Sequence, residues 1–236
     1  MSTSNLSSVR QSLPGEAAWV KALRNVPAWR PPARPTVIIS PHPDDETLGA
    51  GGLIASQIRR GIPVDIIAVT DGEAAYAGQT GLAVIRRVEQ ENAVRELGVS
   101  ARAITRLGFP DAGVTDLEGE LGERLSRFID AGSLIVAPWS NDCHPDHEAC
   151  GRVAERLARA TGATLISYLF WSWHHHPVNA LVPLPLRRFE LSESLMTAKS
   201  KALSRHKSQL ERDDGPPILP EVYLGPARRN FETFII

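Results

Sequence analysis

Two short segments of the sequence contain residue types that bind metal ions and transfer protons. The first, PHPDDE at residues 41–46, places one imidazole and three carboxylates within five residues. Imidazole nitrogen and carboxylate oxygen together suit zinc and related divalent metals. A bend at Pro43 lets His42 and Asp45 converge on one point. Asp44 then points elsewhere, free to act as a base beside a metal.

An alternative interpretation of this segment is a helix start. Asp and Glu commonly begin helices, because their side chains cap free amides and favour the positive end of the helix dipole. Residues 44–47, DDET, could do only that. Three adjacent carboxylates repel one another, however, and a cap needs only one. The crowding favours a functional site.

The second segment, HPDH at residues 144–147, has two histidines three positions apart with an aspartate between them. One histidine completes a zinc set of His42, Asp45 and His147, which leaves an open position for a catalytic metal. The other can act on a reacting carbonyl while Asp146 fixes its tautomer. The alternative is a solvated helix start capped by Asp146. Two His-Pro-Asp segments, both at strand ends, argue against it.

The elements that position these segments follow from the hydrophobic pattern. Buried strands are predicted at 36–40, 63–70, 103–107, 133–137 and 164–170, and helices at 47–60, 82–97, 117–129, 146–161 and 191–209, with a final edge strand at 230–236. In the second helix, Val84, Val88, Ala93 and Leu97 are expected on one side. Strands that alternate with such helices predict a parallel, doubly wound α/β sheet. Chemistry in such sheets gathers beyond the carboxyl ends of the strands, where both segments lie.

Glycines follow the first segment in a pattern that invites a nucleotide-binding interpretation. Gly49, Gly51 and Gly52 resemble the glycines of a dinucleotide-binding turn. That motif belongs at the strand-to-helix turn itself, which the acidic cluster occupies here. A pyrophosphate would meet three carboxylates. We therefore expect these glycines to let a helix pack closely against the sheet.

The first 35 residues differ from the rest of the chain. Residues 16–26 predict a short amphipathic helix with Trp19, Val20 and Leu23 on one face, and four prolines follow between residues 27 and 35. We divide the chain into a leader with a proline-rich linker, 1–35, and a single domain, 36–236.

Composition narrows the function further. Of the 236 residues, 42% are hydrophobic and 22% charged, and the formal net charge is −1. This net charge leaves no excess of positive charge that would attract nucleic acid. No stretch has the length of a membrane span, and the start of the sequence lacks a signal-peptide core, so we expect a cytoplasmic protein. The two cysteines, Cys143 and Cys150, form no CxxC pair.

The two segments resemble the hallmark boxes of the PIG-L/LmbE-like deacetylases, (P/A)HPDDE after the first strand and HPDH later. Further similarities are TDGE at 70–73, an R-x-x-E pattern at Arg86 and Glu89, GFPD at 108–111, and a late helical motif at 201–209. The resemblance covers residues 36 to 210. It implies a Rossmann-like three-layer α/β/α fold and a hydrolase that removes acetyl groups from N-acetylglucosaminyl compounds and related amides.

The resemblance also implies a role for each site residue. One zinc ion per chain is expected on His42, Asp45 and His147. Asp44 is the expected general base, His144 the group that stabilises the oxyanion in its protonated form or protonates the amine, and Asp146 the residue that orients His144. The expected sugar contacts are Glu73, Arg86 and Asp111.

Several alternatives stay open. The substrate, a small-molecule amide and by resemblance an amino-sugar conjugate, could instead be a thiol conjugate or an acyl-glycopeptide. A nucleotide-binding or glycan-binding Rossmann-like protein is the non-enzymatic alternative. Oligomerisation is possible. Trp171 or Trp173 could stack on a sugar ring, whereas the three histidines that follow Trp173 cannot readily share one ion, because neighbours in an extended chain face opposite ways.

Overall fold

The computed structural model describes residues 14–76, 78–213 and 215–236. Its strands are β1 (Thr36–Ser40), β2 (Val64–Thr70), β3 (Ile104–Phe109), β4 (Leu134–Pro138), β5 (Thr164–Tyr168), β6 (Leu186–Glu190) and β7 (Phe231–Ile235). Its helices are α1 (Glu16–Ala22), α2 (Asp45–Arg59), α3 (Leu82–Glu96), α4 (Glu118–Leu125), α5 (Pro145–Thr161), α6 (Ser172–His175), α7 (Val178–Leu181), α8 (Glu193–Leu203) and α9 (Lys207–Leu210). Short 3-10 segments lie at Leu23–Asn25, Ala101–Ala103, Val114–Leu117, Ser126–Phe128, Glu221–Tyr223 and Pro226–Arg228.

The strands of the described residues form one sheet in the order β3-β2-β1-β4-β5-β7-β6. Strands β1 to β5 pair in parallel, and β7 runs antiparallel to both β5 and β6. The chain order reverses at β1, which pairs with β2 on one side and β4 on the other. The carboxyl ends of β1 and β4 therefore adjoin at the switch point where such sheets bind ligands.

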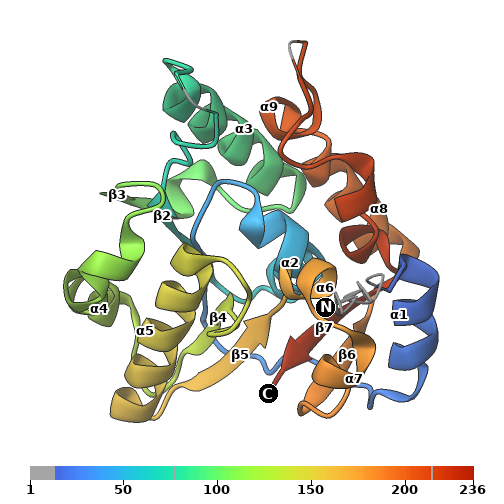
Figure 1. Ribbon diagram of the computed structural model, residues 1–236. Coiled ribbons are helices and arrows are strands. Elements are labelled where there is room, and N and C mark those ends of the chain that lie inside the picture. Colours follow the sequence, from blue (N-terminus) through green and yellow to red (C-terminus); the bar gives the residue numbers. More distant parts are fainter. Residues whose placement is uncertain (1–13, 77, 214) are drawn as a thin grey trace, which may run out of the picture.

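Helices cover both faces of the sheet, and the strand pleat explains how. Successive side chains of a strand point to opposite faces. In β1, Ile38 packs in a cluster with α2, α3 and α8, whereas Val37 and Ile39 pack in a second cluster with α4 and α5. Figure 1 shows α4 and α5 on one side of the sheet and α2, α3 and α8 on the other. The predicted three-layer α/β/α fold is confirmed.

The glycines of α2 permit close packing, as expected. A Cβ on Gly49 would lie 2.4 Å from the Tyr168 ring, and one on Gly52 would lie 2.4 Å from Leu191. Real Cβ atoms do not approach other atoms so closely. The helix also breaks at Ala50, whose φ of −142° and ψ of 15° are not helical.

The predicted core face of α3 is wrong in part. Val84 and Val88 are 64% and 52% exposed, and the buried side chains include Arg86 and Gln90. These two donate hydrogen bonds to Asp44 and Glu46, respectively. The helix is rotated so that these polar side chains face the segment at residues 41–46. Hydrophobic periodicity alone does not predict this orientation.

The C-terminal third departs most from the predictions. The final strand, β7, is not an edge strand, because β6 covers it. The strand β6 was missed: prolines at 183 and 185 precede it, and Arg187 and Arg188 break its apolar pattern. The predicted helix 191–209 divides into α8 and α9.

The part of the predicted leader that is described packs on the sheet domain. Trp19 and Leu23 are buried in one cluster with Trp173 and Phe231, while Val20 is 43% exposed, contrary to the expected face. None of the helices in the described residues combines the length and apolar character that a bilayer crossing requires.

Candidate active site

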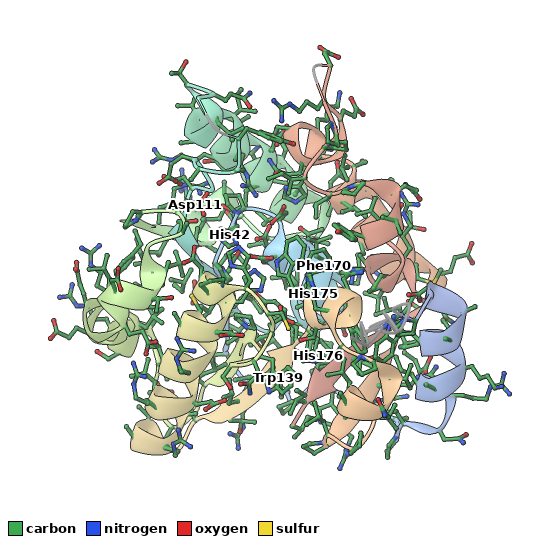
Figure 2. The ribbon with its side chains drawn as sticks, viewed as in Figure 1. His42, Asp111, Trp139, Phe170, His175 and His176 are labelled. Carbon is green, nitrogen blue, oxygen red and sulfur yellow. The ribbon has the colours of Figure 1, made fainter. Side chains whose placement is uncertain are left out.

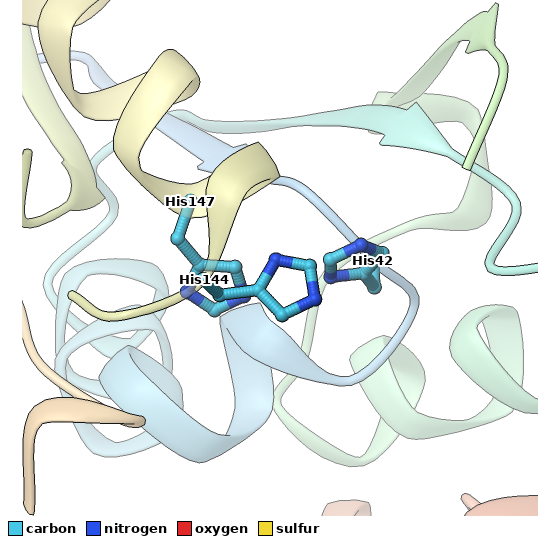
Figure 3. A group of neighbouring side chains, drawn as sticks. All are labelled: His42, His144 and His147. Carbon is cyan, nitrogen blue, oxygen red and sulfur yellow. The ribbon is translucent and has the colours of Figure 1, made fainter. Parts of the chain in front are cut away.

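The two sequence segments meet where β1 and β4 end. Residues 41–44 connect β1 to α2, and residues 139–144 connect β4 to α5. Figure 3 shows His42, His144 and His147 gathered at this junction. Their ring centroids are 4.8 to 5.4 Å apart. Adjacent parallel strands thus bring together residues about a hundred positions apart.

The expected ligands converge on Asp45. Its Oδ2 lies 3.2 Å from Nδ1 of His42 and 3.2 Å from Nε2 of His147. Nε2 of His147 is buried and, apart from its ionic contact with Asp45, has no hydrogen-bond partner among the described residues. A buried imidazole nitrogen beside a carboxylate suits a divalent metal ion, which takes the place of the proton on that nitrogen. The residues present therefore fit a divalent metal ion.

Ligand atoms within 4.8 Å of one another also define two further triads among the described residues. One is His42, His144 and His147, and the other is His42, Asp111 and Asp146. Neither contains Asp45. We prefer the set with Asp45, because the second triad lies on the other nitrogen of His42 and because Asp45 Oδ2 lies 3.2 Å from both Nδ1 of His42 and Nε2 of His147.

Sequence reasoning missed Asp142, the partner of the other nitrogen of His147. Its Oδ2 lies 2.9 Å from Nδ1 of His147. The fully buried carboxylate also accepts bonds from the backbone N–H groups of Phe170 and Ser172. It holds a proton on Nδ1 and leaves the lone pair on Nε2, as carboxylate partners of metal-bound histidines do. Its one sequence signal is its place on the β4 loop, five residues before His147.

Burial lowers the pKa of His147, but the carboxylates of Asp45 and Asp142 outweigh this effect and raise the pKa to about 9. The paired acidic groups thus attract positive charge into a fully buried position. A divalent cation would supply that charge without a proton.

The second nitrogen of His42 is held by two carboxylates. Nε2 lies 3.2 Å from Asp111 Oδ1 and 3.2 Å from Asp146 Oδ2. Figure 2 shows His42 and Asp111 next to each other. Asp111 and Asp146 raise the pKa of His42 well above its usual range, against the lowering effect of burial. A proton on Nε2 leaves Nδ1 as the atom directed at Asp45.

The expected contact between the Asp146 carboxylate and the His144 ring is a point of correction. That carboxylate accepts bonds from the backbone N–H groups of Ala112 and Val114, besides its contact with His42. The link to His144 is made by the backbone instead: the N–H of Asp146 donates to Nδ1 of His144 over 3.3 Å. The backbone of the loop at 111–114 binds this carboxylate and so directs it away from the His144 ring. The sequence does not reveal the path of this loop.

The protonation of His144 also differs from expectation. Burial, followed by the charges of His147 and His42, lowers the pKa of His144 to about 4. The ring is therefore neutral near pH 7. Because Nδ1 accepts a bond from the backbone, the ring proton lies on Nε2. A neutral imidazole in this tautomer donates a hydrogen bond but supplies no proton.

Asp44 occupies a strained and buried position. Its φ of 155° lies in a region that non-glycine residues rarely adopt, and its side chain is buried. Burial raises the pKa of Asp44 to about 7, although Arg86 opposes the shift. Backbone strain of this kind occurs where surrounding structure holds a functional residue in place.

Arg86 was expected to contact a sugar, and the structure places it against Asp44. One guanidinium nitrogen lies 3.2 Å from Asp44 Oδ2 and also donates to the carbonyl of Pro43. The other terminal nitrogen donates to the carbonyl of Gly72. A Cβ on Gly72, whose φ is +65°, would lie 2.0 Å from Arg86. The glycine thus makes room for the arginine.

The other two residues expected to contact a sugar, Asp111 and Glu73, lie in different surroundings. Asp111 lines the central cavity, while Glu73 is exposed and accepts a bond from the Asp111 backbone N–H over 3.0 Å. Trp171 also lines the cavity, but Trp173 is buried beneath Trp19. The cavity has a volume of about 330 Å³.

Comparison with known proteins places this geometry in context. The sequence model of the PIG-L family, described as GlcNAc-PI de-N-acetylase, matches residues 37–158. That range contains all nine residues predicted for the site. A Bacillus subtilis (strain 168) protein named "Probable N-acetyl-alpha-D-glucosaminyl L-malate deacetylase 2" is 34% identical over 131 residues, 51% of this chain and 58% of the relative. This chain spans 58% to 60% of the length of the first three curated relatives it matches.

Solved structures share the fold. The conserved protein TT1542 from Thermus thermophilus superposes with a TM-score of 0.65 at 23% identity, covering 86% of this chain and 94% of that chain. The N,N'-diacetylchitobiose deacetylase from Pyrococcus horikoshii superposes with a TM-score of 0.59 at 23% identity, covering 81% and 73%. At such identities the likeness concerns the fold alone.

Proposed function

Because this chain belongs to the PIG-L family, we propose that it is a zinc-dependent hydrolase that removes an N-acetyl or other N-acyl group from an N-acetylglucosamine-type conjugate. Acetate and a free amine are the products when the acyl group is acetyl. The observation that carries this proposal is the convergence of Nδ1 of His42, Oδ2 of Asp45 and Nε2 of His147, with Asp44 beside them. A cytoplasmic location belongs to the same proposal.

His42, Asp45 and His147 would hold one zinc ion per chain. When bound, the ion would polarise the amide carbonyl and make water a stronger acid, with a pKa lowered from ~16 to ~7. Asp142 and the pair Asp111 and Asp146 fix the ring orientations of the two histidines.

Asp44 takes the proton of the attacking water. A pKa of about 7 makes it a base matched to neutral pH. Arg86 fixes one of its oxygens, so the carboxylate keeps its orientation while it gains and loses a proton. As the carbon–oxygen bond forms and the carbon–nitrogen bond breaks, Asp44 returns this proton to the leaving amine nitrogen.

His144 stabilises the oxygen of the reacting carbonyl. Its Nε2–H donates a hydrogen bond to the negative charge that develops there, while the backbone N–H of Asp146 fixes the tautomer. Removing one such donor typically costs about 100- to 1,000-fold in rate. A neutral imidazole suffices for this role, in accord with the lowered pKa of His144.

Asp44→Asn tests the proposal. The variant should keep its zinc, because Asp44 is not a ligand in this arrangement, and should lose about 100- to 10,000-fold in turnover, as general-base removal does. Metal content by mass spectrometry and acetate release from N-acetylglucosamine conjugates measure the two effects. Wild-type deacetylation by this variant would show that the base is another residue. Protein free of bound metal, with activity indifferent to chelator and added zinc, would refute the metal mechanism.

A further inference from the structure

The cavity has an apolar wall. That wall consists of Leu48, Phe170, Trp171, Ile218 and Leu219. Leu48, Phe170 and Leu219 are buried and belong to one hydrophobic cluster, against which Trp171 and Ile218 pack. A substrate in this cavity therefore contacts both charged groups and hydrocarbon.

Trp171 places this wall beside the reaction centre. Its ring stacks on that of His144 with centroids 6.0 Å apart and an interplanar angle of 23°. Phe170 and Tyr223 pack edge-on against the same indole, with centroids 5.1 and 5.8 Å away. The indole is thus held from three directions. Any substrate group that contacts this indole lies next to the carbonyl oxygen to which His144 donates its hydrogen bond.

The C-terminal part of the wall is anchored. The backbone N–H of Ile218 donates to the Tyr76 hydroxyl over 2.9 Å, and that hydroxyl donates to the carbonyl of Ser208. The N–H of Leu219 donates to the carbonyl of Gln209 over 2.9 Å. Polar side chains and backbone thus hold Ile218 and Leu219 in place before any ligand arrives, which lowers the ordering cost of binding.

The charges of the cavity disfavour an anionic substituent. Among the described residues that line it, Arg86 is the sole lysine or arginine, and it is 3% exposed and already bonded to Asp44 and two carbonyls. Asp44 and Asp111 present carboxylates to the same space. Apart from the metal ion, which would bind the amide carbonyl, a dicarboxylate such as malate would find no lysine or arginine among these lining residues that is not already paired. Desolvating such a charge without a partner is costly.

We propose that the cavity selects an amino-sugar amide that carries an uncharged hydrocarbon group close to the reacting carbonyl. The hydrocarbon is carried either as the aglycone or as an acyl chain longer than acetyl. This inference rests on the proposed function, and it names the substrate class for the same site. The apolar residues bury the hydrocarbon, and the polar residues of the same cavity hold the amide.

The test compares four synthetic substrates with the zinc-loaded, full-length protein. They are the methyl, phenyl and malyl glycosides of N-acetylglucosamine, and the methyl glycoside of N-octanoylglucosamine; release of the free amine is measured for each. We expect kcat/KM for the phenyl or the octanoyl substrate to exceed that of methyl N-acetylglucosaminide by at least about tenfold, since each methylene in an apolar pocket contributes about that much or more. The malyl glycoside should be no better than the methyl one. A smaller ratio for both apolar substrates, or a preference for the malyl glycoside, would overturn the inference.

A binding measurement separates this inference from the proposed function. If no substrate yields amine, the proposed hydrolase activity fails. Calorimetry with phenyl and methyl glucosaminide, the product amines, then still decides the inference, because their binding needs no turnover. Phenyl glucosaminide should bind at least about tenfold more tightly than the methyl compound. Octanoate and acetate, the acid products, test the acyl chain in the same way, and equal affinities within both pairs would contradict the apolar subsite.

Variants locate the effect on the wall. Ile218→Ala should reduce the preference for apolar substrates, and Ile218→Arg should shift the ratio of kcat/KM values toward the malyl glycoside by about tenfold or more, because it adds the missing cation. Val222→Ala is the matched control: the residue lies on the same C-terminal segment, is 75% exposed and does not line this cavity. Melting curves check that each variant is folded. A preference unchanged in folded Ile218 variants would contradict the assignment of the wall.

Discussion

At the scale of single residues, His147 illustrates how the two ring nitrogens acquire different roles. Nδ1 faces Asp142 over 2.9 Å, while Nε2 faces Asp45 over 3.2 Å and has no hydrogen-bond partner among the described residues. Both carboxylates are buried. Asp142 also accepts bonds from the backbone N–H groups of Phe170, Trp171 and Ser172 and from the Ser172 hydroxyl. It is therefore rigid, and it can fix the ring of His147 in its ligand orientation.

Asp142→Asn should weaken zinc binding by about 10- to 100-fold, the usual effect of losing such a partner. The amide is less basic than the carboxylate and holds the Nδ1 proton less firmly. Competition with a chromogenic chelator measures the affinity. Asp116→Asn, which changes an exposed aspartate in a 3-10 segment, is the control. Equal zinc affinities for the two variants would refute the role of Asp142.

Whether a contact in the site could be predicted depended on whether strand ends or loop paths bring its residues together. That His42, Asp45 and His147 lie close together could be predicted because their segments follow strands β1 and β4, whose carboxyl ends adjoin. Asp142 and Asp146 could not be assigned correctly, because their partners are set by loop paths. The Asp146 carboxylate binds backbone at 112 and 114, and Asp142 binds backbone at 170 to 172. No pattern near either aspartate encodes those approaches.

His174 gives a prediction about pH. Burial, followed by the charges of His175 and Arg229, lowers the pKa of His174 to about 4 from 6.5. The unfolded chain takes up a proton below pH 6.5, whereas the folded protein does not. The contribution of His174 to stability is therefore complete above pH 6.5 and is lost as the pH falls toward 4.

His174→Gln removes this titration. Relative to the variant, the wild type should lose about 1 kcal/mol of unfolding free energy between about pH 7.5 and 5, after allowance for partial exposure. Urea unfolding of both proteins at both pH values gives the difference. Other titrating groups are common to the two proteins and cancel. A pH-independent difference between them would show that His174 titrates normally.

At the scale of elements, the break in α2 matters because its first turn carries Asp45. The N–H groups of Gly52 and Leu53, freed by the break at Ala50, donate to the two carboxylate oxygens of Glu232 in β7. Lys199 of α8 bridges both sides: its Nζ lies 2.6 Å from Glu232 Oε1 and donates to the carbonyl of Leu48. Both charges are buried. The pair thus supplies partners to the two interrupted helix ends.

Glu232→Gln should cost about 3–5 kcal/mol of unfolding free energy, because it leaves the Lys199 ammonium buried and unpaired. The double variant Lys199→Met with Glu232→Gln should recover part of that loss. Denaturant unfolding of both single variants and the double variant forms a complete cycle. Additive costs in this cycle would mean that the two charges do not act as a pair.

Helices and strands whose sequence has one dominant hydrophobic pattern were predicted closely. Those in which an edge position or buried polar residues conflict with that pattern were not. The strands β1, β2, β4 and β5 are apolar because both faces are covered, and their bounds follow from that. The strand β6 mixes Leu186 and Phe189 with two arginines, since it is an edge strand. In α3, the burial of Arg86 and Gln90 beside the site outweighs the apolar stripe that Val84 and Val88 suggested.

At the scale of the whole molecule, α1 joins distant parts of the chain. The indole of Trp19 packs edge-on against Trp173 with centroids 5.0 Å apart, and its Nε1 donates to the carbonyl of Trp173. The carboxylate of Glu16 accepts two bonds from Arg229, just before β7. The same cluster contains Phe231 of β7 and Leu186 of β6. The antiparallel edge of the sheet and α1 therefore share one core.

Trp19→Ala should accordingly destabilise the whole protein by about 3–5 kcal/mol, the cost of removing a buried tryptophan. The side chain is 1% exposed, and its loss leaves a cavity between α1 and α6 and an unpaired carbonyl at Trp173. Val20→Ala is the control, since Val20 lies next in the same helix but is 43% exposed; its cost should stay below about 0.5 kcal/mol. Urea unfolding followed by far-UV circular dichroism measures both. Similar small losses for the two variants would mean that α1 rests on the surface without contributing to the core. A single unfolding transition, shifted by Trp19→Ala, would show that α1 and the sheet unfold as one cooperative unit.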